Sequence, residues 1–328
     1  MRFQATAGRK ENRRSMGIVD YQLVKFIFKK VKNKKKKKKK IAKFVLECGF
    51  RPDNSQSWSW TVRINHKLNK SLTCNRDLMV SKCGGVLVTP GHVLTAAHCV
   101  DGLKDPEDVI VARGLENVET QGYVSRRAKK LHFAPEASRP KPIQRFEMKD
   151  VDMAIIELES PFHGSQPICL PYLSDEFINV NTTGTLNGHS CSRGFHVEQI
   201  HVNDGKSCIQ DYWNNAESLN KSNCQNPDEY WNAYHDFKAT LSKIPYQRFP
   251  SLCSRHLTKN TMTCGDSGGP LMIQVGTDQW VVIGVTSAVL DQKRRADFCQ
   301  DDEEEFHYTR YEAVAPKLPW IRSIIGEM

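Results

Sequence analysis

The stretch TCGDSGGPL, residues 263–271, decides how the rest of the chain is interpreted. Glycines on both sides of the Asp266-Ser267 pair let the backbone turn sharply and present the serine hydroxyl. The amides of Gly265 and Ser267 can then point at one spot and hold a negatively charged oxygen. Since a Gly-Asp-Ser-Gly-Gly-Pro string arises by chance on the order of once in ten million positions, the stretch predicts a nucleophilic serine.

Two earlier segments supply the groups that such a serine needs. LTAAHCV contains His98, whose imidazole can accept the serine proton and return it to a leaving amine. In DVDMAIIEL, Asp152 stands directly before an apolar run, where its carboxylate can accept a hydrogen bond from the other imidazole nitrogen. Asp150 is the rival, but the apolar run that follows Asp152 favours Asp152 as the buried carboxylate. The segments predict a triad in the order histidine, aspartate, serine.

From Cys48 onward the sequence has the texture of an all-β protein. Short runs rich in Val, Ile, Thr and Trp are separated by Gly, Pro, Asn and Asp, which is typical of a sandwich or barrel. The runs that we predict as strands are Trp58 to Ile64, Gly85 to Val88, Val109 to Ala112, Met153 to Leu158 and Trp280 to Ser287. A helix is predicted over Pro316 to Ile325, and a second short one within Tyr212 to Leu241.

The positive charge of the chain is confined to its first part. The net charge is +10, but residues 1–47 carry 17 Lys/Arg against 3 Asp/Glu, so the remainder is net negative. Lys34 to Lys40 is an unbroken lysine run, which predicts a basic, disordered segment over 1–47 and one domain over 48–328. Polyanion binding by this run, to nucleic acid or heparin, is the alternative that we do not favour.

Cysteine usage indicates an oxidising compartment. Eleven cysteines without a CxxC pair or zinc spacing suggest a disulfide framework, so we expect no metal site and no cofactor. Glycosylation sequons at Asn69, Asn181 and Asn220 fit an extracellular setting. The sequence contains no run of about 20 apolar residues, so we predict no membrane span. The polar, basic start is unlike a secretory signal, so we expect the natural start to be missing.

The three segments resemble the chymotrypsin-like (trypsin-type) serine proteases, and the resemblance runs from about Cys48 to the C-terminus. It implies two packed six-stranded β-barrels with a cleft between them. It also implies endopeptidase activity on a protein substrate, with His98, Asp152 and Ser267 as the triad and with Gly265 and Ser267 as the oxyanion hole.

A narrower resemblance is to the protease domains of complement factor B and complement component two, proteins of innate immunity. In place of an Ile-Val-Gly-Gly start the chain reads ECGFRPDNSQSWSWTVRI, and PICLP, DGKSC and FHYTRYEAVAPKLPWI have counterparts there. This implies a secreted protease that a cofactor protein or the substrate activates. Such activation matters for Asp266, because its buried carboxylate would need compensation.

The resemblance also implies four disulfides, each of which stabilises a fold by about 2–4 kcal/mol. It leaves Cys74, Cys191 and Cys224 unassigned. The implied pairs are Cys83 with Cys99, Cys48 with Cys169, Cys208 with Cys253, and Cys264 with Cys299.

The sequence departs from the family beside the predicted site. Cys264 directly precedes Gly265, where the family has one residue between them, and loss of an oxyanion donor costs about 10²–10³ in rate. Where the family has Ser-Trp-Gly along the substrate wall, Ser287 is kept but Ala288 and Val289 follow it. The alternative function is therefore a catalytically weak pseudoprotease that acts as an extracellular binding module.

The specificity pocket has two interpretations. Thr261 and Met262 are uncharged where trypsin keeps an aspartate, whereas Glu305 precedes Phe306-His307 as the acid does in factor B. We therefore expect Glu305 to pair with a substrate arginine, with Ser287 and Val289 along the binding wall. If the segment is registered on ordinary trypsins instead, Phe306 fills the pocket.

Overall fold

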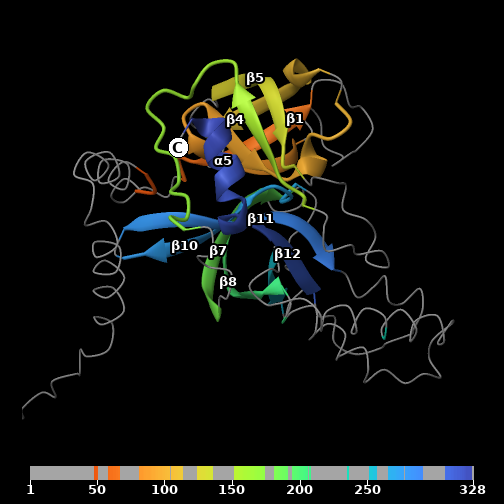
Figure 1. Cartoon of the computed structure of the whole chain (residues 1–328), viewed down its shortest axis with the longest axis vertical. Coiled ribbons are helices and arrows are strands. Elements are labelled where there is room, and N and C mark those ends of the chain that lie inside the picture. The colour runs from red at the N-terminus through yellow and green to blue at the C-terminus, as the bar shows by residue number, and fades with distance from the viewer. Residues whose placement is uncertain are drawn as a thin grey trace, which may run out of the picture. The chain divides into compact units, whose positions relative to one another are not determined.

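Two closed antiparallel barrels of six strands each make up the described fold (Figure 1). The computed structural model describes residues 48–50, 58–66, 81–103, 105–113, 124–135, 151–173, 181–190, 194–205, 207, 235, 251–256, 265–276, 278–290 and 307–326. Contacts divide the chain between Glu47 and Cys48, and all of these residues belong to the second part. The predicted basic segment 1–47 and most of Tyr212 to Leu241 lie outside them.

The first barrel closes in the order β1-β2-β3-β6-β5-β4. Its strands are apolar runs separated by turns. Strand β6 is buried along most of its length, as expected for a run in which apolar and polar residues do not alternate. The bounds are β1 Thr61–His66, β2 Ser81–Thr89, β3 His92–Thr95, β4 Val109–Arg113, β5 Val124–Phe133 and β6 Ala154–Leu158. Short 3₁₀ turns lie at η1 Ala97–Cys99 and η2 Pro106–Asp108.

The second barrel closes in the order β10-β11-β12-β9-β8-β7. Its bounds are β7 Asn181–Ser190, β8 Gly194–Asp204, β9 Ser251–His256, β10 Pro270–Val275, β11 Gln279–Leu290 and β12 His307–Ala313. The all-β class with two six-stranded barrels, implied by the resemblance, is confirmed.

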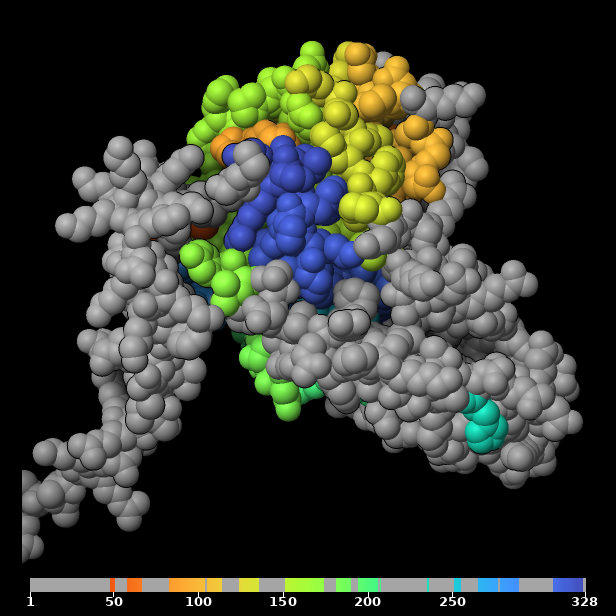
Figure 2. Space-filling view, viewed as in Figure 1, coloured from red at the N-terminus to blue at the C-terminus, as the bar shows by residue number. Residues whose placement is uncertain are grey.

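The chain ends with the 3₁₀ turn η8 Ala315–Lys317 and the helix α5 Leu318–Ile325. Leu318 and Ile321 are buried in the same hydrophobic cluster as the strands of the first barrel, although they follow the last strand of the second. Figure 2 shows the blue C-terminal residues at the surface beside the yellow residues of β5. The predicted C-terminal helix is therefore present, and its buried residues join a cluster that is built mainly from the first barrel.

Aromatic side chains pack between the two barrels. Trp58 and Trp60 lie in the turn before β1, not in the strand that we predicted there, and their rings pack edge to face at 5.7 Å. Trp58 packs in the same way on Trp280 of β11, at 4.9 Å between ring centroids. The Trp60 indole N–H donates to Met272 of β10 at 3.2 Å. Aromatic packing thus helps to place this segment between the barrels.

Candidate active site

His98 lies in η1, directly after β3, and Cys99 beside it is joined to Cys83 of β2 by a disulfide. The 16-residue separation of these cysteines closes a short loop, so the histidine sits on a segment that is covalently held to the barrel. The His98 side chain is 28 % exposed. It is therefore accessible to a ligand from one side and held from the other.

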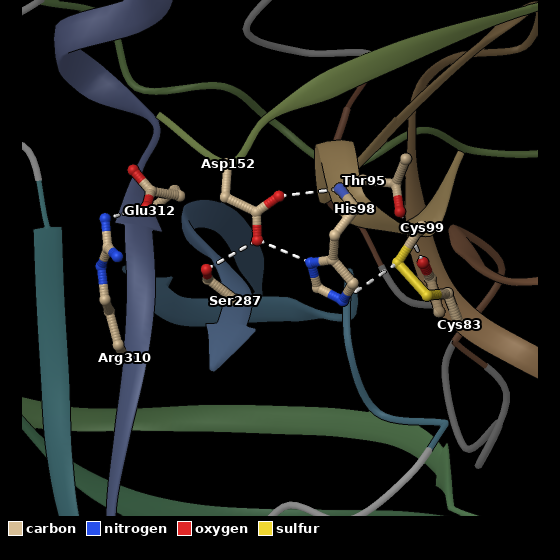
Figure 3. A network of polar contacts seen from close by, with 9 residues as sticks. Cys83, Thr95, His98, Cys99, Asp152, Ser287, Arg310 and Glu312 are labelled. Atoms are coloured by element: carbon tan, nitrogen blue, oxygen red, sulfur yellow. Dashed lines mark hydrogen bonds and ion pairs between the residues drawn. A yellow bond between two sulfur atoms is a disulfide. The ribbon is translucent and has the colours of Figure 1, made fainter. Parts of the chain in front are cut away.

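Asp152 holds His98 by two hydrogen bonds (Figure 3). The His98 backbone N–H donates to Oδ1 at 2.9 Å, and Oδ2 lies 2.7 Å from Nδ1 of the ring. Pairing of β3 with β6, which sets Thr95 opposite Ala154, brings the two residues together. Because a carboxylate only accepts, Nδ1 carries the proton, and Nε2 is left as the basic nitrogen.

Ser287 of β11 supplies a third bond to the same carboxylate. Its hydroxyl donates to Asp152 Oδ2 at 2.7 Å, and both residues are buried. From the sequence we expected Ser287 only on the substrate wall, because a hydroxyl contact between the barrels leaves no signal in the local pattern. The Ser287 side chain points to Asp152 instead. A contact between Ser287 and a substrate, made through its backbone, stays a prediction.

Backbone hydrogen bonds anchor the segment Gly265–Gly269, which we call the oxyanion loop. The Gly84 N–H donates to the Ser267 carbonyl at 2.7 Å, and the Gly268 N–H donates to the Thr286 carbonyl at 2.7 Å. Gly84 follows Cys83, and Thr286 precedes Ser287. One anchor is thus next to Cys83, whose disulfide holds Cys99 beside His98, and the other is next to Ser287, which donates to Asp152.

Two donors of the oxyanion loop remain available for a ligand. Among the described residues, neither the Gly265 nor the Ser267 amide donates to an acceptor. Within the same residues, the Ser267 hydroxyl makes no hydrogen bond to His98, whose Nε2 lies 3.8 Å from the Cys99 sulfur. The distance from nucleophile to base is often longer in structures without substrate. Among the described residues, the loop is therefore anchored through Gly84 and Thr286 and not by a hydrogen bond to the imidazole.

Asp266, between the two proposed oxyanion donors, is completely buried. Its Oδ1 lies 3.5 Å from Nε2 of His196, which comes from β8. From the sequence we expected this carboxylate to need compensation, but no residue of the chain was identified as its partner. The pairing of β7 with β8 brings His196 to it, across a distance in sequence that no local pattern spans.

Figure 3 shows a buried ion pair on the side of Asp152 that faces away from His98. Arg310 donates to Glu312 on β12, and their side chains are 7 % and 1 % exposed. Burial raises the pKa of Glu312 to about 7; the positive charge of Arg310 opposes this increase, and the negative charge of Asp152 adds to it. Sequence reasoning missed this pair, since alternate charges on a strand ordinarily indicate a solvated face.

The other predicted site residues are placed only in part. Glu305 lies outside the described residues, and Val289 stands on β11 opposite Thr309 of β12. Besides the Cys83–Cys99 bond, a disulfide joins Cys48 to Cys169. Cys253 is disulfide-bonded, but its expected partner Cys208, like the expected pair Cys264 and Cys299, lies outside the described residues. The unassigned Cys74, Cys191 and Cys224 lie outside them too.

One group of ligand atoms in the described part of the chain is close enough together to suggest a metal, namely those of Cys83, His98 and Cys99. The two sulfurs are bonded to each other, so they do not offer thiolates to an ion. Among the described residues no helix is long and apolar enough to cross a membrane.

Two closed barrels with a histidine–aspartate pair and an anchored Gly-Asp-Ser-Gly-Gly-Pro loop between them define a trypsin-like serine protease. The chain belongs to the trypsin family, whose model matches residues 47–229. This match includes His98 and Asp152 and ends before Ser267. The chain is also similar to the atrial natriuretic peptide-converting enzyme of Mus musculus, with 25 % identity over 213 residues. The similarity covers 62 % of this chain and 16 % of the relative.

Proposed function

We propose that the chain is a serine endopeptidase that uses His98, Asp152 and Ser267 as its catalytic triad. The observation that carries the proposal is the pair of hydrogen bonds that Asp152 accepts from His98, which leaves Nε2 as the base beside an anchored Ser267 loop. The Ser267 hydroxyl attacks a peptide carbonyl, and His98 takes its proton and then donates it to the leaving amine. Water, activated by the same imidazole, releases the acid and restores the serine.

The negative charge that develops on the carbonyl oxygen is met by the amides of Gly265 and Ser267. Their freedom from acceptors among the described residues supports this role. Donors aimed at that oxygen account for about 10²–10³ in rate each. Asp152 remains ionised and stabilises the imidazolium, while Ser287 holds the carboxylate.

A fluorophosphonate probe tests this proposal, because it reacts only with a serine that a base and an oxyanion hole activate. We expect the wild-type chain to be labelled and Ser267→Ala to be unlabelled, with Ser160→Ala, an exposed serine in the first barrel, as the matched control. A folded wild-type chain that takes no label would contradict catalysis. It would favour the alternative, a pseudoprotease that serves as an extracellular binding module.

For the substrate we propose cleavage after arginine, as in proteases of the complement factor B type, with Glu305 as the pairing acid. A panel of peptide esters with Arg, Lys, Ala, Val and Phe before the scissile bond tests this preference. Glu305→Gln should abolish arginine preference alone.

We further propose that the protein is secreted, glycosylated and active on a protein substrate with the help of an activating protein, as in complement. The Cys48–Cys169 and Cys83–Cys99 disulfides support secretion, and Asn181 lies exposed at the start of β7, where a glycan can attach. The related mouse protein is by name a peptide-converting enzyme, which favours limited cleavage of a precursor. Expression in a secreting eukaryotic cell, with glycosidase treatment before mass measurement, tests secretion and glycosylation.

A further inference from the structure

The carboxylate of Asp266, within the oxyanion loop, is enclosed by the protein. It is fully buried, and its residue lies between the two proposed oxyanion donors. The Asp266 carbonyl also accepts the Gly269 N–H at 3.0 Å, which closes the loop on itself. Any group that fixes this carboxylate therefore also fixes the direction of the neighbouring amides. An ionised carboxylate in such a place requires a cation nearby.

His196 is placed to be that cation. Its Nε2 lies 3.5 Å from Asp266 Oδ1, and its Nδ1 lies 3.3 Å from the Gly194 carbonyl oxygen. A carbonyl and a carboxylate only accept hydrogen bonds, so both ring nitrogens face acceptors. At 3.5 Å, Nε2 and Oδ1 are within ion-pair distance but do not form a hydrogen bond, and an imidazolium has one N–H for each of the two acceptors. The side chain is only 10 % exposed, so water screens the pair weakly.

Gly188 makes room for the pair. It stands opposite His196 in the β7–β8 register, and a Cβ at this position would meet Asp266 Oδ1 at 2.5 Å and His196 Cε1 at 3.6 Å. Any larger residue would push the carboxylate away from the imidazole. The β7–β8 hairpin thus supplies both the space and the charge for Asp266.

We propose that His196 is a positioning residue for catalysis: its imidazolium holds Asp266 and thereby orders the oxyanion loop. This inference rests on the proposed function, because it assigns His196 to the same site. The positive charge that His196 supplies to Asp266 comes from β8, a strand of the second barrel itself.

Three variants test the inference. His196→Ala removes the charge, His196→Lys keeps a cation, and His201→Ala removes an exposed histidine from the same strand. We expect the rate of fluorophosphonate labelling to fall at least tenfold in His196→Ala and to return to within about threefold of wild type in His196→Lys. With the best ester of the substrate panel, the loss should be in kcat with KM nearly unchanged. His201→Ala should behave as wild type.

Hydrogen–deuterium exchange supplies a readout that does not depend on turnover. The amides of Gly265–Gly269 should exchange faster in His196→Ala than in wild type, while those of the first barrel stay unchanged. Unchanged exchange and labelling in His196→Ala would overturn the inference and leave the proposed function intact. A wild-type chain that takes no label would instead contradict the proposed function. In that case the exchange experiment still decides whether His196 orders the loop.

Discussion

The hydroxyl of Ser287 donates to Asp152 Oδ2 at 2.7 Å, although the two residues lie 135 positions apart and belong to different barrels. The same oxygen lies 2.7 Å from His98 Nδ1. One carboxylate oxygen therefore meets a donor from each barrel. The geometry of the histidine–aspartate pair depends on how the second barrel docks on the first.

Replacing Ser287 by alanine should weaken catalysis without unfolding the protein. Loss of one hydrogen bond to the carboxylate costs about 1 kcal/mol, which corresponds to a roughly fivefold fall in kcat. Ser287→Thr, which keeps a hydroxyl, should recover part of the rate. Steady-state kinetics on a peptide ester, with a thermal melt of each variant, measure this. Equal kcat in wild type and Ser287→Ala would show that His98 and its own bonds suffice to hold Asp152.

Gly268→Ala should abolish activity. Gly268 has φ +80°, and a Cβ there would overlap Thr95 Oγ1 and the Gly84 carbonyl oxygen. The loop would have to leave its anchors, so we expect kcat/KM to fall at least 100-fold. Gly164→Ala is the matched control, because Gly164 has φ +72° but nothing lies within 4 Å of its Cβ position. That variant carries similar backbone strain, about 1–3 kcal/mol, and should remain active. Similar losses of activity in both would contradict the steric explanation.

Arg310→Met should destabilise the fold strongly. It leaves the buried carboxylate of Glu312 without its ion-pair partner, and breaking such a pair costs about 3–5 kcal/mol. The double variant Arg310→Met with Glu312→Gln removes both charges and should recover most of that loss. Urea unfolding at pH 7 measures the free energies. A double variant as unstable as the single one would show that packing, not the uncompensated charge, accounts for the loss.

His189 should make the protein sensitive to acid. Burial lowers the pKa of His189 to about 3, and the charges of Arg63 and His196 add to this effect. The unfolded chain takes up this proton below about pH 6.5 and the folded chain only near pH 3, so stability falls as the pH falls through this range. His189→Phe keeps a ring beside Phe195, 5.0 Å away, but cannot ionise.

The expected result is a smaller loss of stability in the His189→Phe variant than in wild type. Between pH 7 and pH 4.5 the difference in the change of unfolding free energy should be about 2 kcal/mol. Urea unfolding at the two pH values measures it, with His163→Gln, at an exposed histidine, as the control. Parallel loss in wild type and His189→Phe would mean that other groups govern the acid sensitivity.

Features that depend on a few neighbouring residues could be predicted from the sequence. The flanking glycines of Ser267, the apolar run after Asp152 and the alternation of strands and turns are all visible within a few residues. They predicted the all-β class and, through the resemblance, the two barrels. The start of β1 was misplaced because Trp58 and Trp60 look like strand residues, whereas they fill the space between the barrels as packed rings.

The sequence could not predict contacts that depend on strand register over long distances. Nothing near His196 marks it as the histidine that meets Asp266, because that contact follows from the pairing of β8 with β7. For the same reason nothing in the local sequence marks Arg310 and Glu312 as a buried pair. A buried charge is recognised from its surroundings, and these come together only in the folded barrel.

The position of α5 has a consequence for synthesis on the ribosome. Domains usually fold in the order in which they are translated, the N-terminal one first. Here Leu318 and Ile321, made after both barrels, pack into the hydrophobic cluster that contains most of the buried residues of the first barrel. That cluster therefore cannot be completed before the C-terminal helix has been made. A premature stop before Leu318 would remove two of its buried side chains.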